Sequence, residues 1–168
     1  HDWDDVTFNL IDWEAHGNSV RNHYNLKHFI VKYLHNWMPT GSLTARYGVK
    51  YTPQCPSCDC EKEDREHFLR CPARKQWQTD MLMDIRKQST TLQTKPKLLD
   101  ILIEGLQSWF DQRQPHFHMY SQQHTALVQK QTRAGWEQLL FGRFVMEWRD
   151  VQDDYLSKNK DIKQHQNG

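Results

Sequence analysis

Four residues of the types that bind soft metal ions lie within one short stretch of the chain. Cys55 and Cys58 are followed by His67 and then by Cys71, in the spacing C-x2-C-x8-H-x3-C. Three thiolates and one imidazole form a ligand set that structural Zn²⁺ commonly takes in a tetrahedral arrangement. His67 and Cys71 are four residues apart, so one helical turn would place them on the same face. The pattern predicts one bound zinc ion.

The same stretch leaves two alternatives open. Cys60 could replace Cys58 as a ligand, although the two-residue gap after Cys55 is the common one in zinc knuckles. A disulfide is the other use of such thiols, but all four cysteines of the chain lie between residues 55 and 71, together with a histidine. This clustering is typical of metal binding in a reducing compartment. We therefore expect an intracellular protein, in the nucleus or the cytoplasm.

The predicted centre is structural, because a zinc ion with four protein ligands has no open position for a reacting water molecule. The nearby acidic residues Glu61, Glu63, Asp64 and Glu66 are interpreted as a solvated loop beside the metal rather than as catalytic carboxylates. The sequence contains no Gly-rich phosphate loop, no G-x-S-x-G and no H-E-x-x-H motif. We expect a protein that is not an enzyme.

The composition describes a folded chain rich in aromatic residues. Of its 168 residues, 37% are hydrophobic and seven are tryptophan, so a core can form, and the length suits one domain. The longest apolar runs are too short to span a membrane. Apolar residues recur at helical spacing between turn signals. The sequence predicts a mostly α-helical bundle with a small zinc knuckle and a long C-terminal helix.

We expect four successive regions along the chain. They are an N-terminal arm (1–19), a helix with the zinc knuckle and a following helix (20–88), a C-terminal helical region (89–158) and a polar tail (159–168). The arm could instead contain a short strand, because Val6, Phe8 and Leu10 alternate with polar residues.

Turn residues set the expected helix bounds. A helix over 20–38 would begin at Asn18 or Ser19 and end at the turn that starts with Pro39. Ser42 would cap a short helix from Leu43 to Tyr47, and another helix would begin at Pro72. The remaining predictions are a loop over 88–97, a helix over 98–110 after Pro96, a connection over 112–118, and one long helix over 121–156, which Gly135 or Gly142 would kink.

Basic residues flank the proposed zinc knuckle, although the net charge of the chain is only +1. Residues 15–50 contain five Lys or Arg residues and no acid, and residues 72–97 contain six against two acids. Such residues near exposed rings can contact nucleic-acid phosphates, and a solvated helix face is the alternative interpretation. The candidate nucleic-acid-binding residues are Arg21, Lys27, Lys32, Lys50, Arg74 and Lys75.

Three runs of residues around the cysteines resemble a known protein family. They read FIVKYLHNWMPTGSLTARYGV (29–49), CPSC (55–58) and EHFLRCP (66–72). In order and spacing, over residues 26–77, they resemble the zinc-binding region at the C-terminal end of non-LTR retrotransposon reverse transcriptases. The departures from the family are Asp59 at a position usually occupied by Gly, one residue fewer between His67 and Cys71, and the additional Cys60.

The resemblance implies a structural-zinc accessory module of a retroelement-derived protein that assists RNA or DNA binding. Other domains of a reverse transcriptase polyprotein would be its partners, and no membrane partner is expected. A zinc-stabilised protein-interaction or structural module without nucleic-acid affinity is the alternative. An endonuclease is a third hypothesis, but the chain shows neither a clear P-D-x(n)-[DE]-x-K pattern nor a polymerase Y/F-x-D-D motif.

Overall fold

The computed structural model of the protein describes residues 3–48, 52–117 and 121–166, without the side chains of residue 24 and residues 161–166. Helices dominate these residues, and no β-strand occurs among them. Ile11 and Val145 form an isolated antiparallel bridge. The predicted mostly α-helical fold is therefore confirmed. No helix in the described ranges is both long and apolar enough to cross a membrane.

The described residues form α-helices and short 3₁₀ helices (η), which follow one another along the chain. They are α1 (Asp5–Phe8), α2 (Trp13–Asn22), η1 (Tyr24–Leu26), α3 (Lys27–Leu34), α4 (Gly41–Thr44), η2 (Ala45–Tyr47), α5 (Arg65–Arg70), η3 (Pro72–Arg74), α6 (Lys75–Thr91), α7 (Pro96–Phe110), α8 (Gln122–Ala134), η4 (Trp136–Phe141) and α9 (Glu147–Gln166).

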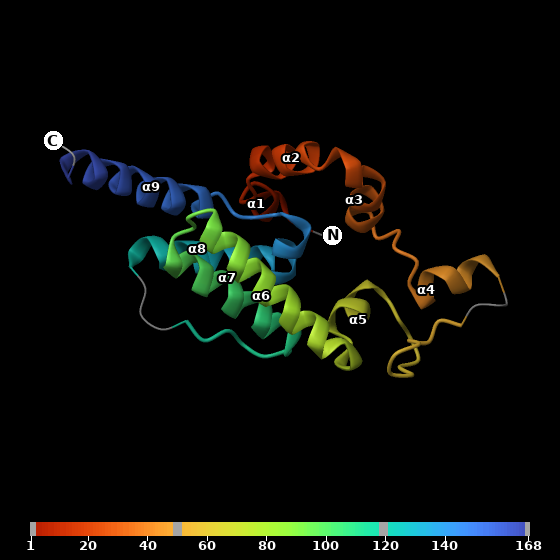
Figure 1. The fold of residues 1–168 in the computed structure, drawn as a ribbon. Helices are drawn as coiled ribbons and strands as arrows, with labels where there is room; N and C mark the ends of the chain where they lie inside the picture. Colours follow the sequence, from red (N-terminus) through yellow and green to blue (C-terminus); the bar gives the residue numbers. More distant parts are fainter. Residues whose placement is uncertain (1–2, 49–51, 118–120, 167–168) are drawn as a thin grey trace.

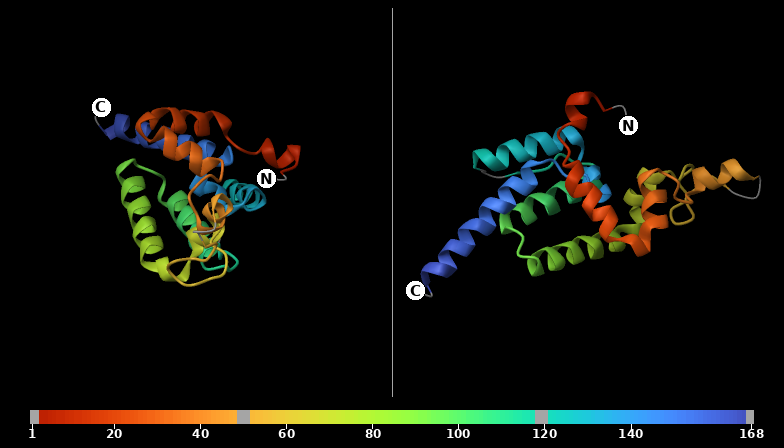
Figure 2. Two further views of the ribbon diagram at one scale, coloured as in Figure 1. Left: turned by 90° about the vertical axis from the view of Figure 1, so that its right-hand side faces the viewer. Right: turned by 90° about the horizontal axis from the view of Figure 1, so that it is seen from above.

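The molecule is elongated, with α4 and the cysteine-containing segment at one end and the C-terminus of α9 at the other (Figure 1). The view from above shows the same two projections (Figure 2). Between them, α7 is in contact with α6, η4 and α9, and α8 packs on α9. The residues that are fully buried in this bundle include Leu98, Ile101, Leu106, Leu127, Val145 and Val151.

α7 and η4 approach closely because residue 105 is a glycine. A Cβ atom at Gly105 would collide with the indole ring of Trp136. The indole of Trp136 therefore occupies the space of the missing side chain and is only 7% exposed. This contact joins the middle of α7 to the segment between α8 and α9.

The single long helix predicted over 121–156 is wrong, because two glycines with positive φ interrupt it. Gly135 (φ 102°) ends α8, and Gly142 (φ 67°) ends η4 in the left-handed conformation. The predicted kink sites are thus complete breaks. α9 begins at Glu147 and continues to Gln166, so most of the predicted polar tail is helical.

The predicted helix over 20–38 is also wrong in its bounds. α2 begins at Trp13, because the Asp12 carboxylate caps it by accepting a hydrogen bond (2.9 Å) from the backbone N–H of Ala15. The predicted caps, Asn18 and Ser19, therefore lie inside α2. Likewise, the strand alternative near the N-terminus is wrong, since residues 5–8 form α1.

The chain between α2 and α4 turns twice. After His23, it continues as η1 and α3, and α3 ends at Leu34. The N–H of Trp37 then bonds to the carbonyl of Lys32 (2.7 Å), with Asn36 in the left-handed region (φ 60°). This is a Schellman-type helix end, and it leaves the Trp37 side chain outside the helix.

The other predicted bounds are closer to the structure. α4 begins at Gly41, two residues before the predicted start, after the cap residue Thr40. Pro72 begins η3, which leads directly into α6, and Pro96 begins α7 as expected. The predicted loop over 88–97 is shorter, because α6 extends to Thr91. The connection after α7 is confirmed within the described residues 112–117, and residue 118 lies outside them.

Candidate metal centre

The structure brings the predicted ligands Cys55, Cys58, His67 and Cys71 together into one cluster. Their potential ligand atoms all lie within 4.8 Å of one another. The Sγ atoms of Cys55 and Cys71 are 3.8 Å apart, and Sγ of Cys58 is 3.2 Å from Nε2 of His67. In a tetrahedral centre with Zn–S bonds of about 2.3 Å, neighbouring sulfur atoms would be separated by about 3.8 Å. The cluster can therefore hold a metal ion.

A tight turn positions the first two ligands. The N–H of Asp59 bonds to the carbonyl of Cys55 (3.0 Å), and the N–H of Cys55 bonds to the carbonyl of Cys60 (2.8 Å). Asp59 has φ 58°, in the left-handed region that glycine adopts most easily and that aspartate tolerates better than most residues. The backbone thus explains why a glycine would suit this position.

The short helix α5 positions the other two ligands. Its cap residue Asp64 accepts a hydrogen bond (2.9 Å) from the backbone N–H of His67, which fixes this histidine in the first turns of the helix. Cys71 follows at the C-terminal end of α5. One helical turn therefore separates His67 from Cys71, as their spacing predicts.

Cys60 lies apart from this cluster. Its thiol is exposed, and Sγ is 3.9 Å from the carbonyl oxygen of Lys62. Cys55 and Cys71 are fully buried, whereas Cys58 is half-buried. Of the two cysteines that the sequence left as alternatives, Cys58 is the one placed with the other three residues.

The thiols of the cluster do not ionise equally in the absence of a cation. Burial opposes ionisation of Cys55, but hydrogen bonds from the backbone of Ser57 and from His67 outweigh it and lower its pKa to about 7. A backbone hydrogen bond from Cys60 favours the Cys58 thiolate, but burial and the charge on Cys55 outweigh it and raise the pKa of Cys58 to about 11. A bound divalent cation would compensate this repulsion and deprotonate coordinating thiols.

A buried carboxylate connects the cluster to its surroundings. Glu63 is 5% exposed, and its Oε1 lies 3.7 Å from Sγ of Cys55. Its oxygens accept hydrogen bonds of 2.8 Å from the N–H of Gly41 and from the guanidinium of Arg74. Burial opposes ionisation, but these two hydrogen bonds outweigh it and hold the pKa of Glu63 below its usual value. Residues 53–63 carry Cys55 and Cys58, and we call them the ligand loop. Glu63 therefore joins α4 and η3 to the ligand loop.

The start of α4 lies directly against the ligand loop. A Cβ atom at Gly41 would be 2.8 Å from the carbonyl oxygens of both Pro53 and Gln54, so only glycine allows this approach. The N–H of Ser42 bonds to the carbonyl of Glu63 (2.9 Å) at the same contact. The ligand loop and α4 thus form one unit.

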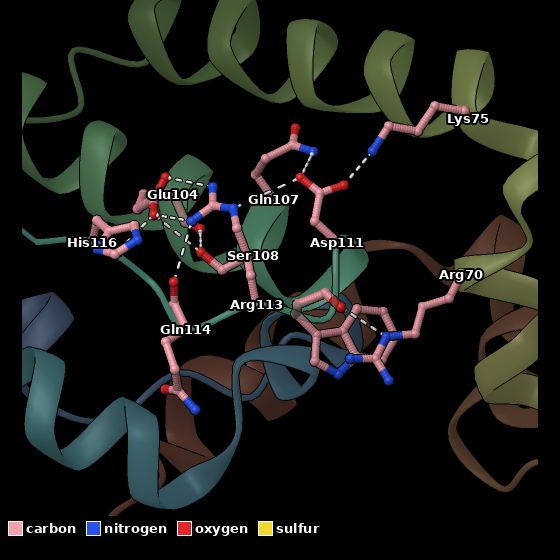
Figure 3. A network of polar contacts seen from close by, with 10 residues as sticks. Arg70, Lys75, Glu104, Gln107, Ser108, Asp111, Arg113, Gln114 and His116 are labelled. Atoms are coloured by element: carbon pink, nitrogen blue, oxygen red, sulfur yellow. Dashed lines mark hydrogen bonds and ion pairs between the residues drawn. The ribbon is translucent and has the colours of Figure 1, made fainter.

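The six predicted nucleic-acid-binding residues occupy different environments. Arg74 binds Glu63 and lies 4.2 Å above the ring of Phe68, so its guanidinium supports the metal centre. Lys75 forms an ion pair with Asp111 (Figure 3), and Arg21 donates a hydrogen bond to Asn18. Lys27 and Lys32 are exposed on α3, and residue 50 lies outside the described residues.

The ion pair of Lys75 is part of a polar network at the end of α7. Figure 3 shows Arg113 and His116 directed toward Glu104. The Glu104 carboxylate accepts hydrogen bonds from the Arg113 guanidinium (2.6 and 3.1 Å) and from the backbone N–H of His116 (2.7 Å). Mainly because of Arg113, the pKa of Glu104 falls to about 2. The network fastens the connection after α7 to that helix.

An open groove beside the metal centre was not predicted from the sequence. It has a volume of about 580 Å³, and it lies between the end of α3, the α4–η2 segment and the start of α5. Two aromatic residues in its lining, Trp37 and Tyr47, are 61% and 80% exposed. Its cationic side chains are Arg46, Lys62 and Arg65. We call this feature the aromatic groove.

The acidic residues of the aromatic groove are already engaged. Asp64 caps α5 and pairs with Lys62 (3.4 Å), and Glu66 pairs with Arg70. By contrast, no carboxylate of the described residues lies within ion-pair distance of Arg46 or Arg65. The groove therefore combines exposed rings with uncompensated positive charge. The sequence did contain a signal of this groove, because Trp37, Arg46 and Tyr47 lie close together in the chain before the zinc knuckle.

Comparisons with known protein families, with curated proteins and with solved structures found no match to this chain.

Proposed function

We propose that this chain is a structural-zinc accessory module of a retroelement-derived protein, which binds single-stranded RNA or DNA in the aromatic groove. The observation that supports nucleic-acid binding is the groove itself, where the exposed rings of Trp37 and Tyr47 accompany Arg46 and Arg65. Its association with retroelements rests on the resemblance of residues 26–77 to the zinc-binding region of non-LTR retrotransposon reverse transcriptases.

Zinc is the metal that suits the cluster best. Three cysteines and one histidine offer soft and borderline ligands, which favour Zn²⁺ over Mg²⁺ or Ca²⁺. Four protein ligands complete a tetrahedral coordination sphere, so the ion supports the fold and activates no water molecule. The module therefore acts through binding and not through catalysis.

The metal centre and the aromatic groove share their framework. Asp64, which caps the ligand-bearing helix α5, also lines the groove. Glu63 holds the first residue of α4, and the α4–η2 segment carries Arg46 and Tyr47. Zinc binding would fix the ligand loop and thereby the position of this wall.

Single strands suit such a groove better than duplexes. Unstacked bases can stack on the indole of Trp37 and the phenol ring of Tyr47, which contributes roughly 1–3 kcal/mol per base. Arginines nearby can contact phosphates, which makes the affinity dependent on salt. A duplex hides its base faces and would make only the phosphate contacts.

Fluorescence anisotropy with labelled RNA and DNA single strands, and with a duplex, tests this function across a range of salt concentrations. We expect single strands to bind at low salt and to dissociate as salt increases. Trp37→Ala and Tyr47→Ala should each weaken binding about tenfold, the equivalent of about 1.4 kcal/mol. Trp77→Ala is the matched control, because Trp77 is 44% exposed on α6 and does not line the groove. Absence of binding at low salt, or binding insensitive to salt, contradicts the proposal.

A second candidate function is a zinc-stabilised module that binds another domain of the same polyprotein. A different, largely apolar groove of about 530 Å³ favours it, and Leu92, Leu102, Phe144, Trp148 and Leu156 are among its lining residues. This function predicts association with the polyprotein domain in ultracentrifugation, loss of that association in Leu92→Asp, and no affinity for single strands.

A further inference from the structure

Two arginines from distant parts of the chain meet at one aromatic ring. The guanidinium carbon of Arg65, on α5, lies 4.5 Å from the centre of the Phe141 ring. That of Arg143, just after η4, lies 5.7 Å from the same ring. Tyr33 of α3 also packs on Phe141, with 4.8 Å between ring centroids. Three separate segments therefore build this arginine pair.

Among the residues that the structure describes, the pair lacks the carboxylate partner that most arginines of this protein have. Within residues 3–48, 52–117 and 121–160, neither Arg65 nor Arg143 forms an ion pair. Arg143 donates a hydrogen bond to the neutral Gln138 (3.0 Å). The arginines that do pair with a carboxylate are Arg70, Arg74, Arg86, Arg113, Arg133 and Arg149.

One donor of the pair is buried without an acceptor. The Nε atom of Arg143 is inaccessible to solvent and has no hydrogen-bond partner in the described part of the chain. Burial, together with the positive charge of Arg65, holds the pKa of Arg143 below its usual value. Two like charges and an unsatisfied buried donor are unfavourable, and a bound anion would compensate them.

We propose that Arg65 and Arg143 form a clamp that binds one phosphate group. Guanidinium groups offer paired N–H donors that match phosphate oxygens in geometry and charge. Arg65 also lines the aromatic groove, so this residue connects the clamp to the groove. The clamp rests on the proposed function, in which the bases of a single strand stack on Trp37 and Tyr47. The phosphate group that it binds would belong to that strand. Free inorganic phosphate offers the same oxygen atoms, so it is the alternative source of the bound phosphate group.

Salt-dependent anisotropy of Arg65→Gln and Arg143→Gln, with folding checked by circular dichroism, tests the clamp. Each variant should bind a single strand about tenfold more weakly at low salt. The slope of log K against log salt should decrease by up to about 0.7, the value for one neutralised phosphate, because the two arginines share that phosphate. Arg86→Gln is the matched control, because Arg86 is exposed and lies outside the aromatic groove. If the wild type binds the strand and both variants keep its affinity and its salt slope, the clamp is overturned. The proposed function is not affected by that result.

A second measurement separates the clamp from the proposed function. Thermal melting in inorganic phosphate, compared with chloride at equal ionic strength, reports anion binding without any nucleic acid. If no single strand binds but phosphate raises the Tm of the wild type and of neither variant, the clamp is supported and the proposed function fails. If no strand binds and phosphate leaves the wild-type Tm unchanged, both fail.

Discussion

At the residue scale, the ligand cluster depends on hydrogen bonds that the ligands do not make themselves. Asp64 fixes the backbone of His67, and Glu63 lies against Cys55 while binding Arg74. Such partners orient metal ligands and tune their affinity. Arg74, which the sequence suggests as a phosphate contact, has this supporting position in the structure.

The choice between Cys58 and Cys60 gives the first prediction. Cys58→Ser should lose the zinc ion, because it removes a ligand from the cluster, whereas Cys60→Ser should keep about one zinc per chain. Elemental analysis of the purified variants measures this. Zinc retained in Cys58→Ser and lost in Cys60→Ser would show that the ligand set is different.

The buried carboxylate gives the second prediction. Glu63→Gln should lower the free energy of unfolding by roughly 1–3 kcal/mol, since the Arg74 guanidinium would lose its charged partner. It should also weaken zinc binding through the contact with Cys55. Urea denaturation and competition with a zinc indicator measure the two effects. Glu61→Gln is the matched control, because Glu61 is exposed; equal losses in both variants would refute the role of Glu63.

At the element scale, two helical glycines differ in what surrounds them and give the third prediction. Gly105→Ala should destabilise the fold by about 1–3 kcal/mol, because its Cβ would collide with Trp136. Gly17→Ala in α2 should stabilise it by up to about 1 kcal/mol, because the nearest atom would be 4.0 Å away. Thermal unfolding of the two variants measures the difference. Similar Tm values for both would show that Trp136 does not fill this space.

The connection after α7 gives the fourth prediction, which concerns pH. The pKa of Glu104 is lowered from 4.5 to about 2, so its ion pair with Arg113 stabilises the fold fully above pH 4.5 and is lost as pH falls toward 2. Glu104→Gln should cost roughly 1–2 kcal/mol at pH 7, after allowance for solvent screening. The difference from the wild type should vanish near pH 2 in denaturation curves. A constant difference from pH 7 to pH 2 would contradict this assignment.

The elements that the sequence predicts well depend on local signals. Pro72 and Pro96 begin helical segments because proline suits the first turn, and the cysteine spacing identifies the ligand loop. The ends of the helices are harder to predict, because they depend on contacts with residues that are distant in the sequence. Apolar spacing continues through Gly135 and Gly142, and only the structure shows, in their positive φ angles, that the helix ends there.

The aromatic groove shows the limit of sequence reasoning for the candidate site. Trp37 and Arg65 are distant in sequence, and only the fold places both in the same lining. Arg65 and Arg143 are farther apart still, and nothing in their local sequence signals a common ring. The cluster of candidate metal ligands was predictable because its four residues lie within one short segment whose spacing reflects their geometry.

At the scale of the whole molecule, the metal centre and the apolar bundle occupy different parts of an elongated structure (Figure 1). The bundle residues of α7, α8 and α9 pack on one another. Near the ligand loop, α4 instead depends on the contacts of Gly41 and Glu63. Removing zinc should therefore loosen α4 and the ligand loop first and leave the bundle of α7, α8 and α9 folded.

The central claim is tested most directly by the affinity for a labelled single strand, measured at three stages. These are before a chelator removes zinc, after its removal, and after zinc is restored. We predict salt-dependent binding by the zinc-loaded protein, an affinity at least about tenfold weaker on removal, and recovery when zinc returns. A zinc-free protein that binds the strand with the same affinity and the same salt slope would contradict the claim that the metal centre maintains the groove.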